Sequence, residues 1–280
     1  MSVQEYPPLP RHSVDVLGIH TSYYEAGEPH RPALLLLHGM SASADSFREL
    51  MHGLASDYWL VAPDIPGFGY SGDAEPFTFP HLVSWLEAFA EAVHLPPVHA
   101  GGHSFGGALG VSYALAHPGR VQSLVLLAPS VLRPGKVPQW LRSLARTGIA
   151  ERIMELSVSA SRLFLGRQMR AAFYDPRPYP DSLWERRAED YYNSRASAAV
   201  LRASALHDLR PDLHKVRQPS CIIWGKEDPV LDPADARRLD EMMTGSPSTL
   251  HLLEECGHIP HIERRETVEQ IVNDFLEELP

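Results

Sequence analysis

Short, almost uninterrupted apolar runs alternate along the chain with longer segments in which apolar residues recur at helical spacing. The clearest runs lie at residues 33–37, 121–128 and 220–224, and each is followed by His, Pro or Gly. Such bounded runs are typical of strands buried on both faces of a parallel sheet. Helical spacing is found at residues 45–55, 81–94, 105–117, 233–243 and 263–279. This alternation predicts βαβ units, and therefore a mostly parallel sheet with helices on both faces.

The first strands are expected to run in the opposite direction to their neighbours. Residues 13–16 and 20–24 are short stretches that flank Gly18. A glycine between two such stretches suits the tight turn of an antiparallel hairpin. We therefore expect a hairpin at one edge of the sheet, which makes the sheet mixed.

The alternation of strands and helices stops between residues 131 and 211. This stretch predicts helices at 139–146, 150–165 and 181–206 and a proline-rich connector at 175–180, with no convincing strand. The expected fold is therefore α/β: a doubly wound, mostly parallel sheet formed by residues 1–130 and 212–280. Residues 131–211 are expected to form an inserted helical cap.

The composition is that of a soluble globular protein, with 44% hydrophobic and 21% charged residues in a chain of 280. Apolar runs are far shorter than the roughly 18 residues that span a bilayer. The first residues have neither the basic start nor the apolar stretch of a signal peptide. From these features we expect a cytoplasmic protein without a membrane segment.

The charge distribution argues against a nucleic-acid partner, because the formal net charge is −10. Residues 131–210 are nevertheless basic, with fourteen Arg and Lys against eight Asp and Glu. Pairing of these arginines with the acidic remainder of the chain is the favoured interpretation, and attraction of anionic substrates stays open. Cys221 and Cys256 cannot form a disulfide framework and lack metal-ligand spacing, so no metal site is expected.

The strongest chemical signal is the string Gly102-His103-Ser104-Phe105-Gly106, between a short apolar run and the helix at 105–117. A serine in so sharp a strand-to-helix turn needs glycine two residues before and after it, because side chains there would collide. The helix N-terminus beside it favours developing negative charge. The pattern indicates a nucleophilic serine.

An acid and a base follow in positions that could activate this serine. Asp228 comes after the strand at 220–224, and His258 comes after a strand expected at 249–253. A serine hydroxyl needs a base to remove its proton and a third group to orient that base. Glu227 is the local rival to Asp228 and His261 the rival to His258, and both are disfavoured by their positions.

With these residues in place, the chain resembles the α/β-hydrolase fold family, as a serine carboxylesterase-like member with a helical cap. The order Ser104, Asp228, His258 matches the family order at the ends of strands. Two further strings are similar to family motifs: His38-Gly39-Met40 resembles the oxyanion loop, and residues 64–71 resemble an Asp-x-x-Gly-x-Gly-x-Ser loop, in which Asp64 is expected to organise the loop.

The resemblance implies an oxyanion hole formed by the backbone N–H groups of Met40 and Phe105. It implies motif-supporting roles for Gly39, Gly102 and Gly106, and loop-pinning hydrogen bonds for His38 and His103. The residues after Gly39 are Met-Ser-Ala instead of further glycines. This departure argues against bulky tertiary-alcohol esters. The cap is expected to cover the site.

We therefore expect a serine hydrolase that cleaves small-molecule carboxylic esters of short to medium acyl chain and needs no cofactor. Cleavage of a carbon–carbon bond, a lactone or an amide, or perhydrolysis, could run on the same residues. A ligand-binding module without activity is a further alternative. The sequence leaves the physiological substrate and the oligomeric state open.

Overall fold

The computed structural model describes residues 6–132 and 169–279. The helices expected at 139–146 and 150–165 therefore lie outside the described residues. Within the described part of residues 131–211 no strand is present.

The described chain is built around one eight-stranded sheet, with the order β1-β2-β4-β3-β5-β6-β7-β8. β1 pairs antiparallel with β2 and β2 with β4, and all remaining pairs are parallel. The mixed sheet and its edge hairpin are thus confirmed. The strands are β1 (Arg11–Val16), β2 (Ile19–Ala26), β3 (Ala33–Leu37), β4 (Trp59–Pro63), β5 (Val98–His103), β6 (Val121–Leu127), β7 (Ser220–Gly225) and β8 (Ser248–Leu253).

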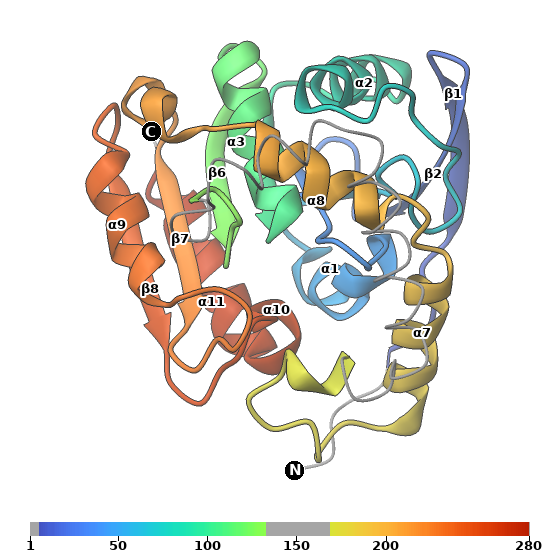
Figure 1. Cartoon of the computed structure of the whole chain (residues 1–280). Helices are drawn as coiled ribbons and strands as arrows, with labels where there is room; N and C mark the ends of the chain where they lie inside the picture. The colour runs from blue at the N-terminus through green and yellow to red at the C-terminus, as the bar shows by residue number, and fades with distance from the viewer. Residues whose placement is uncertain (1–5, 133–168, 280) are drawn as a thin grey trace.

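Helices cover both faces of this sheet (Figure 1). The helices are η1 (Ala44–Phe47), α1 (Arg48–Leu54), α2 (Phe79–Ala92), α3 (Phe105–Ala116), α7 (Asp181–Tyr192), α8 (Ser197–Leu206), η3 (Arg210–Lys215), α9 (Ala234–Met242), α10 (Pro260–Glu263) and α11 (Arg265–Glu277). Buried side chains of α2, α3 and α9 belong to one apolar cluster, and those of α1 and α11 to another. In residues 6–132 and 169–279, no helix combines the length and the apolarity that crossing a bilayer requires.

Strand β3, with one alanine and four leucines, shows why the sheet is buried on both sides. Leu35 and Leu37 point into the cluster with α2 and α3, and Leu34 and Leu36 into the cluster with α1. Successive side chains of a strand point to opposite faces, so a continuous apolar run fits only a strand covered twice. Burial of each such leucine contributes roughly 1.5–3 kcal/mol relative to exposure.

The single helix expected at 181–206 is two helices, because the chain turns between α7 and α8. At this turn Arg195 N and Ala196 N both donate to the carbonyl of Gly67, at 2.8 and 3.0 Å. Gly67 must lack a side chain here, because a Cβ would overlap that of Ala196. A tertiary acceptor thus replaces the intrahelical one and ends α7. α8 lies across the front of the molecule in Figure 1.

Candidate active site

Ser104 lies in the turn between β5 and α3 with φ 50° and ψ −114°. Non-glycine residues rarely adopt a positive φ, and such strain costs about 1–3 kcal/mol. The turn is possible because its flanking glycines carry no side chain: a Cβ on Gly102 would lie 2.5 Å from the carbonyl carbon of Gly106, and a Cβ on Gly106 would overlap the carbonyl of Leu37. Ser104 N donates to Leu127 O at 3.0 Å. The elbow is therefore a rigid feature of the sheet edge.

Asp228 and His258 meet at the same edge of the sheet, in the loops after β7 and β8. The His258 Nδ1 and Asp228 Oδ2 atoms are 2.8 Å apart, and the two residues are only 6% and 8% exposed. A carboxylate can only accept, so Nδ1 carries the proton and Nε2 keeps its lone pair. The pair presents His258 Nε2 as a proton acceptor.

Each of the two carboxylate oxygens of Asp228 accepts two hydrogen bonds. Oδ1 accepts from the backbone N–H groups of Val230 and Leu231 at 2.8 and 3.0 Å. Oδ2 accepts from Trp224 Nε1 at 2.9 Å as well as from His258. These donors fix the orientation of the carboxylate and compensate the burial of its charge.

The rival acid Glu227 has a different task. Its Oε2 accepts from Cys256 N at 3.1 Å, and its own N–H donates to Cys256 O at 3.1 Å. Gly225 permits this close approach of the two loops, because a Cβ there would overlap the carbonyls of Cys256 and Gly257. Glu227 thus ties the acid loop to the histidine loop, and Asp228 is the carboxylate that contacts His258.

The loop after β3 packs directly on the elbow. A Cβ on Gly39 would lie 3.3 Å from Ser104 Cβ and 2.8 Å from His103 Nδ1. The peptide that carries the Met40 N–H is therefore beside Ser104, and Phe105 N–H is at the N-terminus of α3. The Met40 side chain is 39% exposed. Two backbone donors beside a nucleophile can stabilise an oxyanion.

His38 and His103 are both buried and pin neighbouring loops. Ile65 N donates to His38 Nε2 at 2.9 Å, so the proton of this ring is on Nδ1, which donates to Gly39 O at 2.8 Å. His103 Nε2 donates to the carbonyl of His258 at 2.8 Å. Burial lowers the pKa of His38 to about 4 and that of His103 well below 6.5. Both rings therefore stay neutral and act as hydrogen-bond partners.

Asp64 organises the loop at residues 64–71, as expected from the sequence. Its Oδ1 accepts from Ala44 N at 2.8 Å, and its Oδ2 accepts from Tyr70 N at 2.9 Å and from Arg11 Nη1 at 3.0 Å. It is fully buried. These contacts leave it no part in the chemistry at His258.

His261 does not compete with His258, because it lies in α10 behind the site. Its ring is 4.8 Å from the rings of both His103 and Phe47, and the residue is 1% exposed. Neither ring nitrogen has a hydrogen-bond partner among the described residues. Burial lowers the pKa of His261 to about 3. This ring is neutral at all working pH values.

We expect the three buried rings of His38, His103 and His261 to make the fold acid-labile. Below pH 6.5 these histidines are protonated in the unfolded chain, but in the folded chain they stay neutral. The free energy of unfolding therefore falls as the pH falls towards the lowered pKa values. For three sites the slope approaches about 4 kcal/mol per pH unit. Urea unfolding at pH 7.5, 6.0 and 5.0 measures it.

The control for this acid lability is His261→Phe, which keeps an aromatic ring against Phe47 and removes two unpartnered nitrogens. The variant should be more stable than the parent at pH 5, and its slope should fall by about a third. A variant with lower stability and an unchanged slope would contradict the assignment of His261 as a buried neutral ring.

Sequence reasoning missed the contacts by which α7 and α8 reach the loop after β3. Ser43 Oγ donates to Asp190, whose other oxygen accepts from Arg187. The Ser41 and Ser197 hydroxyl oxygens are 3.2 Å apart. The sequence signal for these contacts was weak: Ser41 and Ser43 follow the oxyanion-loop motif, and serines are common in loops of any kind.

Among the described arginines of residues 131–210, two pair with the acidic remainder of the chain. Arg186 binds Asp45 and Glu49 of the η1–α1 segment, at 2.7 and 2.5 Å, and Arg195 binds Asp73 at 2.8 Å. Arg177, Arg187 and Arg210 pair with nearby aspartates: Asp175, Asp190 and Asp208. The pairs of Arg186 and Arg195 agree with the favoured interpretation, and the other three arginines are neutralised within residues 131–210.

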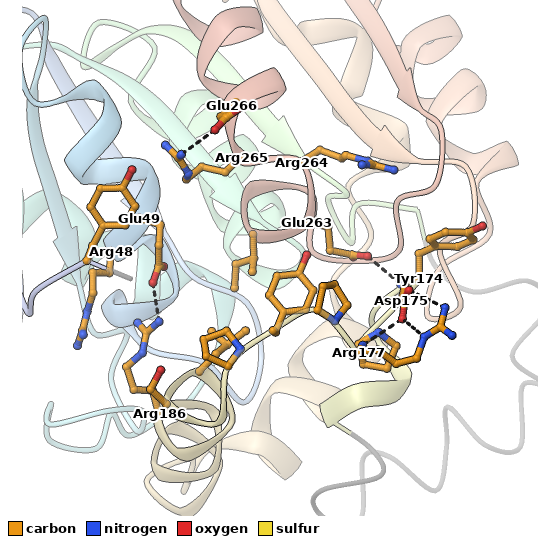
Figure 2. Close-up of a pocket in the computed structure, with 18 of the residues that line it drawn as sticks. Arg48, Glu49, Tyr174, Asp175, Arg177, Arg186, Glu263, Arg264, Arg265 and Glu266 are labelled. Atoms are coloured by element: carbon orange, nitrogen blue, oxygen red, sulfur yellow. Dashed lines mark hydrogen bonds and ion pairs between the residues drawn. The ribbon is translucent and has the colours of Figure 1, made fainter. Parts of the chain in front are cut away.

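A groove of about 1400 Å³ lies between the connector before α7 and the segment from α10 to α11 (Figure 2). None of the residues Ser104, Asp228 and His258 lines it. Five arginines line it, and each pairs with a carboxylate: Arg48, Arg177, Arg186, Arg264 and Arg265. In the part of the chain that the structure describes, no three potential metal ligands gather.

Comparison with known proteins agrees with this geometry. A model of the alpha/beta hydrolase fold matches residues 32–265. The chain is similar to the monoacylglycerol lipase abhd6-B of Xenopus laevis, with 30% identity over 92% of this chain and 79% of that protein. It is similar to the 2-hydroxy-6-oxo-2,4-heptadienoate hydrolase of Pseudomonas putida, with 26% identity over 92% of this chain and 93% of that protein. The crystal structure of a bacterial membrane phospholipase A is similar with a TM-score of 0.77 and 28% identity, over 97% of this chain and 86% of that one.

Proposed function

The chain belongs to the α/β-hydrolase fold family, and on this premise we propose that it is a serine hydrolase that cleaves carboxylic esters of short to medium acyl chain. The observation that carries the proposal is the 2.8 Å contact between Asp228 and His258 at the sheet edge that holds the Ser104 elbow. A nucleophile, a base and an orienting acid at one edge are the parts that acyl transfer needs.

In the proposed reaction, His258 Nε2 takes the proton of Ser104 Oγ as the oxygen attacks the acyl carbon. The tetrahedral oxyanion is held by the N–H groups of Met40 and Phe105, and each such donor is worth roughly 3–4 kcal/mol where one has been removed. His258 then protonates the leaving alcohol, and the acyl group stays on Ser104. Asp228 remains ionised throughout and stabilises the imidazolium.

Hydrolysis of the acyl-enzyme repeats these steps with water. His258 Nε2 removes a proton from the water, whose oxygen attacks the acyl carbon. As the second tetrahedral intermediate collapses to the free acid, His258 donates this proton to the departing oxygen of Ser104. All proton transfers use residues of this chain.

Two observations support the ester class and the chain-length limit. The names of the similar lipase and phospholipase denote enzymes that act on carboxylic esters of lipids. The stretch 131–210 contains thirteen arginines, so it differs from a predominantly apolar lid that would take up long acyl chains at a lipid surface. We therefore place the optimum at acyl chains shorter than palmitate.

The second candidate is hydrolysis of a carbon–carbon bond, which the similarity to the heptadienoate hydrolase favours. The family's carbon–carbon hydrolases typically have a longer loop rich in glycine and proline at the oxyanion position. The loop after β3 of this chain reads Gly39-Met40-Ser41-Ala42. That difference is why the ester reaction is proposed first.

A substrate panel tests the proposal. It contains p-nitrophenyl esters from acetate to palmitate, 1-octanoylglycerol and 1-palmitoylglycerol, a lactone, an amide and a vinylogous diketone acid. We expect turnover of the esters, with kcat/KM for octanoate or shorter acyl groups at least about tenfold above that for palmitate. Cleavage of the diketone alone would assign the carbon–carbon reaction, and preference for palmitate would overturn the chain-length limit.

A further inference from the structure

Two hydroxyl groups in series connect the start of α8 to the loop that carries the proposed oxyanion donor. Ser197, the first residue of α8, is 3% exposed, and its Oγ donates to Ser194 O at 3.3 Å. Each hydroxyl has one proton, so the 3.2 Å contact between Ser41 Oγ and Ser197 Oγ must use the proton of Ser41. The bonds therefore run from Ser41 to Ser197 to the Ser194 carbonyl.

The Ser197 end of this hydrogen-bond series is firmly anchored. Between α7 and α8, the N–H groups of Arg195 and Ala196 bind the carbonyl of Gly67 at 2.8 and 3.0 Å. The Arg195 side chain binds Asp73 at 2.8 Å, and it also binds the carbonyl of Ser71. Ser197 is thus a fixed point and not the tip of a mobile element.

The other end of this hydrogen-bond series, Ser41, lies in the loop that packs on the Ser104 elbow. Ser41 has φ 58°, a left-handed conformation that few side chains favour. It follows Met40, whose N–H is the proposed donor, and Gly39 lies so close to the elbow that a Cβ on it would be 3.3 Å from Ser104 Cβ. A change in the torsion angles at Ser41 would displace Met40 and, through Met40, the Gly39–Met40 peptide whose N–H is the proposed donor.

A second contact restrains the same loop two residues further on. Ser43 Oγ donates to Asp190 of α7, and it also accepts from Asp45 N at 3.2 Å to begin η1. The loop from Gly39 to Ser43 is therefore held at one end by the elbow and at two places by the cap.

Resting on the proposed function, we propose that Ser197 of the cap and Ser41 are positioning residues that aim the Met40 N–H into the oxyanion hole. The start of α8 then takes part in transition-state stabilisation through the loop. A displaced donor binds the oxyanion less well and leaves binding of the neutral ester unchanged.

The test uses Ser197→Ala, Ser41→Ala and the double variant in the full chain. Each single variant should lower kcat by about 10- to 100-fold and leave KM within about threefold, since loss of a complete oxyanion donor costs about 10²–10³. The double variant should be no slower than the slower single one, because both substitutions break one chain of bonds. Ser197→Thr keeps the hydroxyl and should recover part of kcat.

The matched control is Ser220→Ala. Ser220 is equally buried, and its Oγ also donates to a backbone carbonyl, that of Gln218 at 2.9 Å, but it lies at the opposite end of the sheet. This variant should keep kcat within about twofold. Circular dichroism and thermal unfolding show whether each variant is folded.

The second-order rate of phosphonylation by a fluorophosphonate is measured on the same proteins. This reaction uses the same oxyanion donors and needs no knowledge of the substrate, so it should slow in parallel with kcat. Folded variants with unchanged phosphonylation, with a change in KM alone, or with additive losses would each overturn the positioning role. A different result would separate the two proposals: the protein turns over no ester, and phosphonylation is slowed in the Ser41 and Ser197 variants only. That result would overturn the proposed function and leave the positioning role standing.

Discussion

Replacement of Ser104 by alanine is expected to lower ester turnover by about 10⁴-fold or more. In the proposed reaction the hydroxyl of Ser104 forms and breaks the covalent bond to the acyl group, so its removal takes away the nucleophile itself. The residual rate is that of the oxyanion donors and substrate binding alone. Initial rates with p-nitrophenyl butyrate measure the loss.

The fold of the Ser104→Ala variant should be unaffected. Alanine has the same Cβ as serine and bears the same φ of 50°, so thermal unfolding should shift by no more than about 2 °C. Ser220→Ala serves again as the matched serine control. A Ser104→Ala enzyme with more than about a tenth of the parent's rate would show that the elbow is not the nucleophile.

Replacement of Asp228 by asparagine has the second largest expected effect, also about 10⁴-fold on kcat. Oδ1 of Asp228 accepts from two backbone N–H groups, so the amide oxygen must take this place. The amide nitrogen then faces His258 Nδ1, which must become an acceptor, and the ring proton moves to Nε2. His258 in this tautomer cannot take the proton of Ser104.

The same substitution should also cost stability, because the new amide N–H faces the indole N–H of Trp224 at the position of Oδ2. Glu227→Gln is the control: it keeps an acceptor for Cys256 N and should retain activity within about threefold. Kinetics and urea unfolding of both variants measure these effects. The reverse result, with Glu227→Gln inactive and Asp228→Asn active, would transfer the role of the acid to Glu227.

The order of strands and helices could be predicted wherever apolar runs are long or glycines mark a turn. β3, β6, β7 and the hairpin of β1 and β2 all follow from such patterns. β4 was missed, although its apolar run ends in a proline like the predicted strands and residues 59–63 are all buried, so the same pattern could have predicted it. Its strand conformation depends on pairing with β2 on one side and β3 on the other.

The end of α7 could not be predicted, because its cause lies far away in the sequence. Residues 181–206 have continuous helical spacing, and the chain turns only because Arg195 and Ala196 bind the Gly67 carbonyl. Local propensity decides a helix only where no tertiary contact overrides it. The same limitation hid the contact between Ser41 and Ser197, which joins two residues that have no pattern in common.

The site was more predictable than residues 131–211, since each of its parts follows the end of a strand. Parallel strands end at one edge, so Ser104, Asp228 and His258 were expected near one another from their order alone. Position in the sequence already favoured Asp228 over Glu227, and the structure adds the contacts: Asp228 binds His258, and Glu227 binds Cys256 N. The neutral state of His38, His103 and His261 depends on burial, which no motif shows.

The most direct measurement is the location of a covalent adduct on the protein. The full chain is treated with a fluorophosphonate at pH 7.5, digested, and sequenced by mass spectrometry, with Ser104→Ala treated in parallel. One phosphonyl group on Ser104 in the parent, none in the variant, and loss of ester turnover in proportion to labelling are the results expected of a serine nucleophile at the elbow. Stoichiometric labelling of another residue, or full ester turnover by a protein labelled at Ser104, would contradict it.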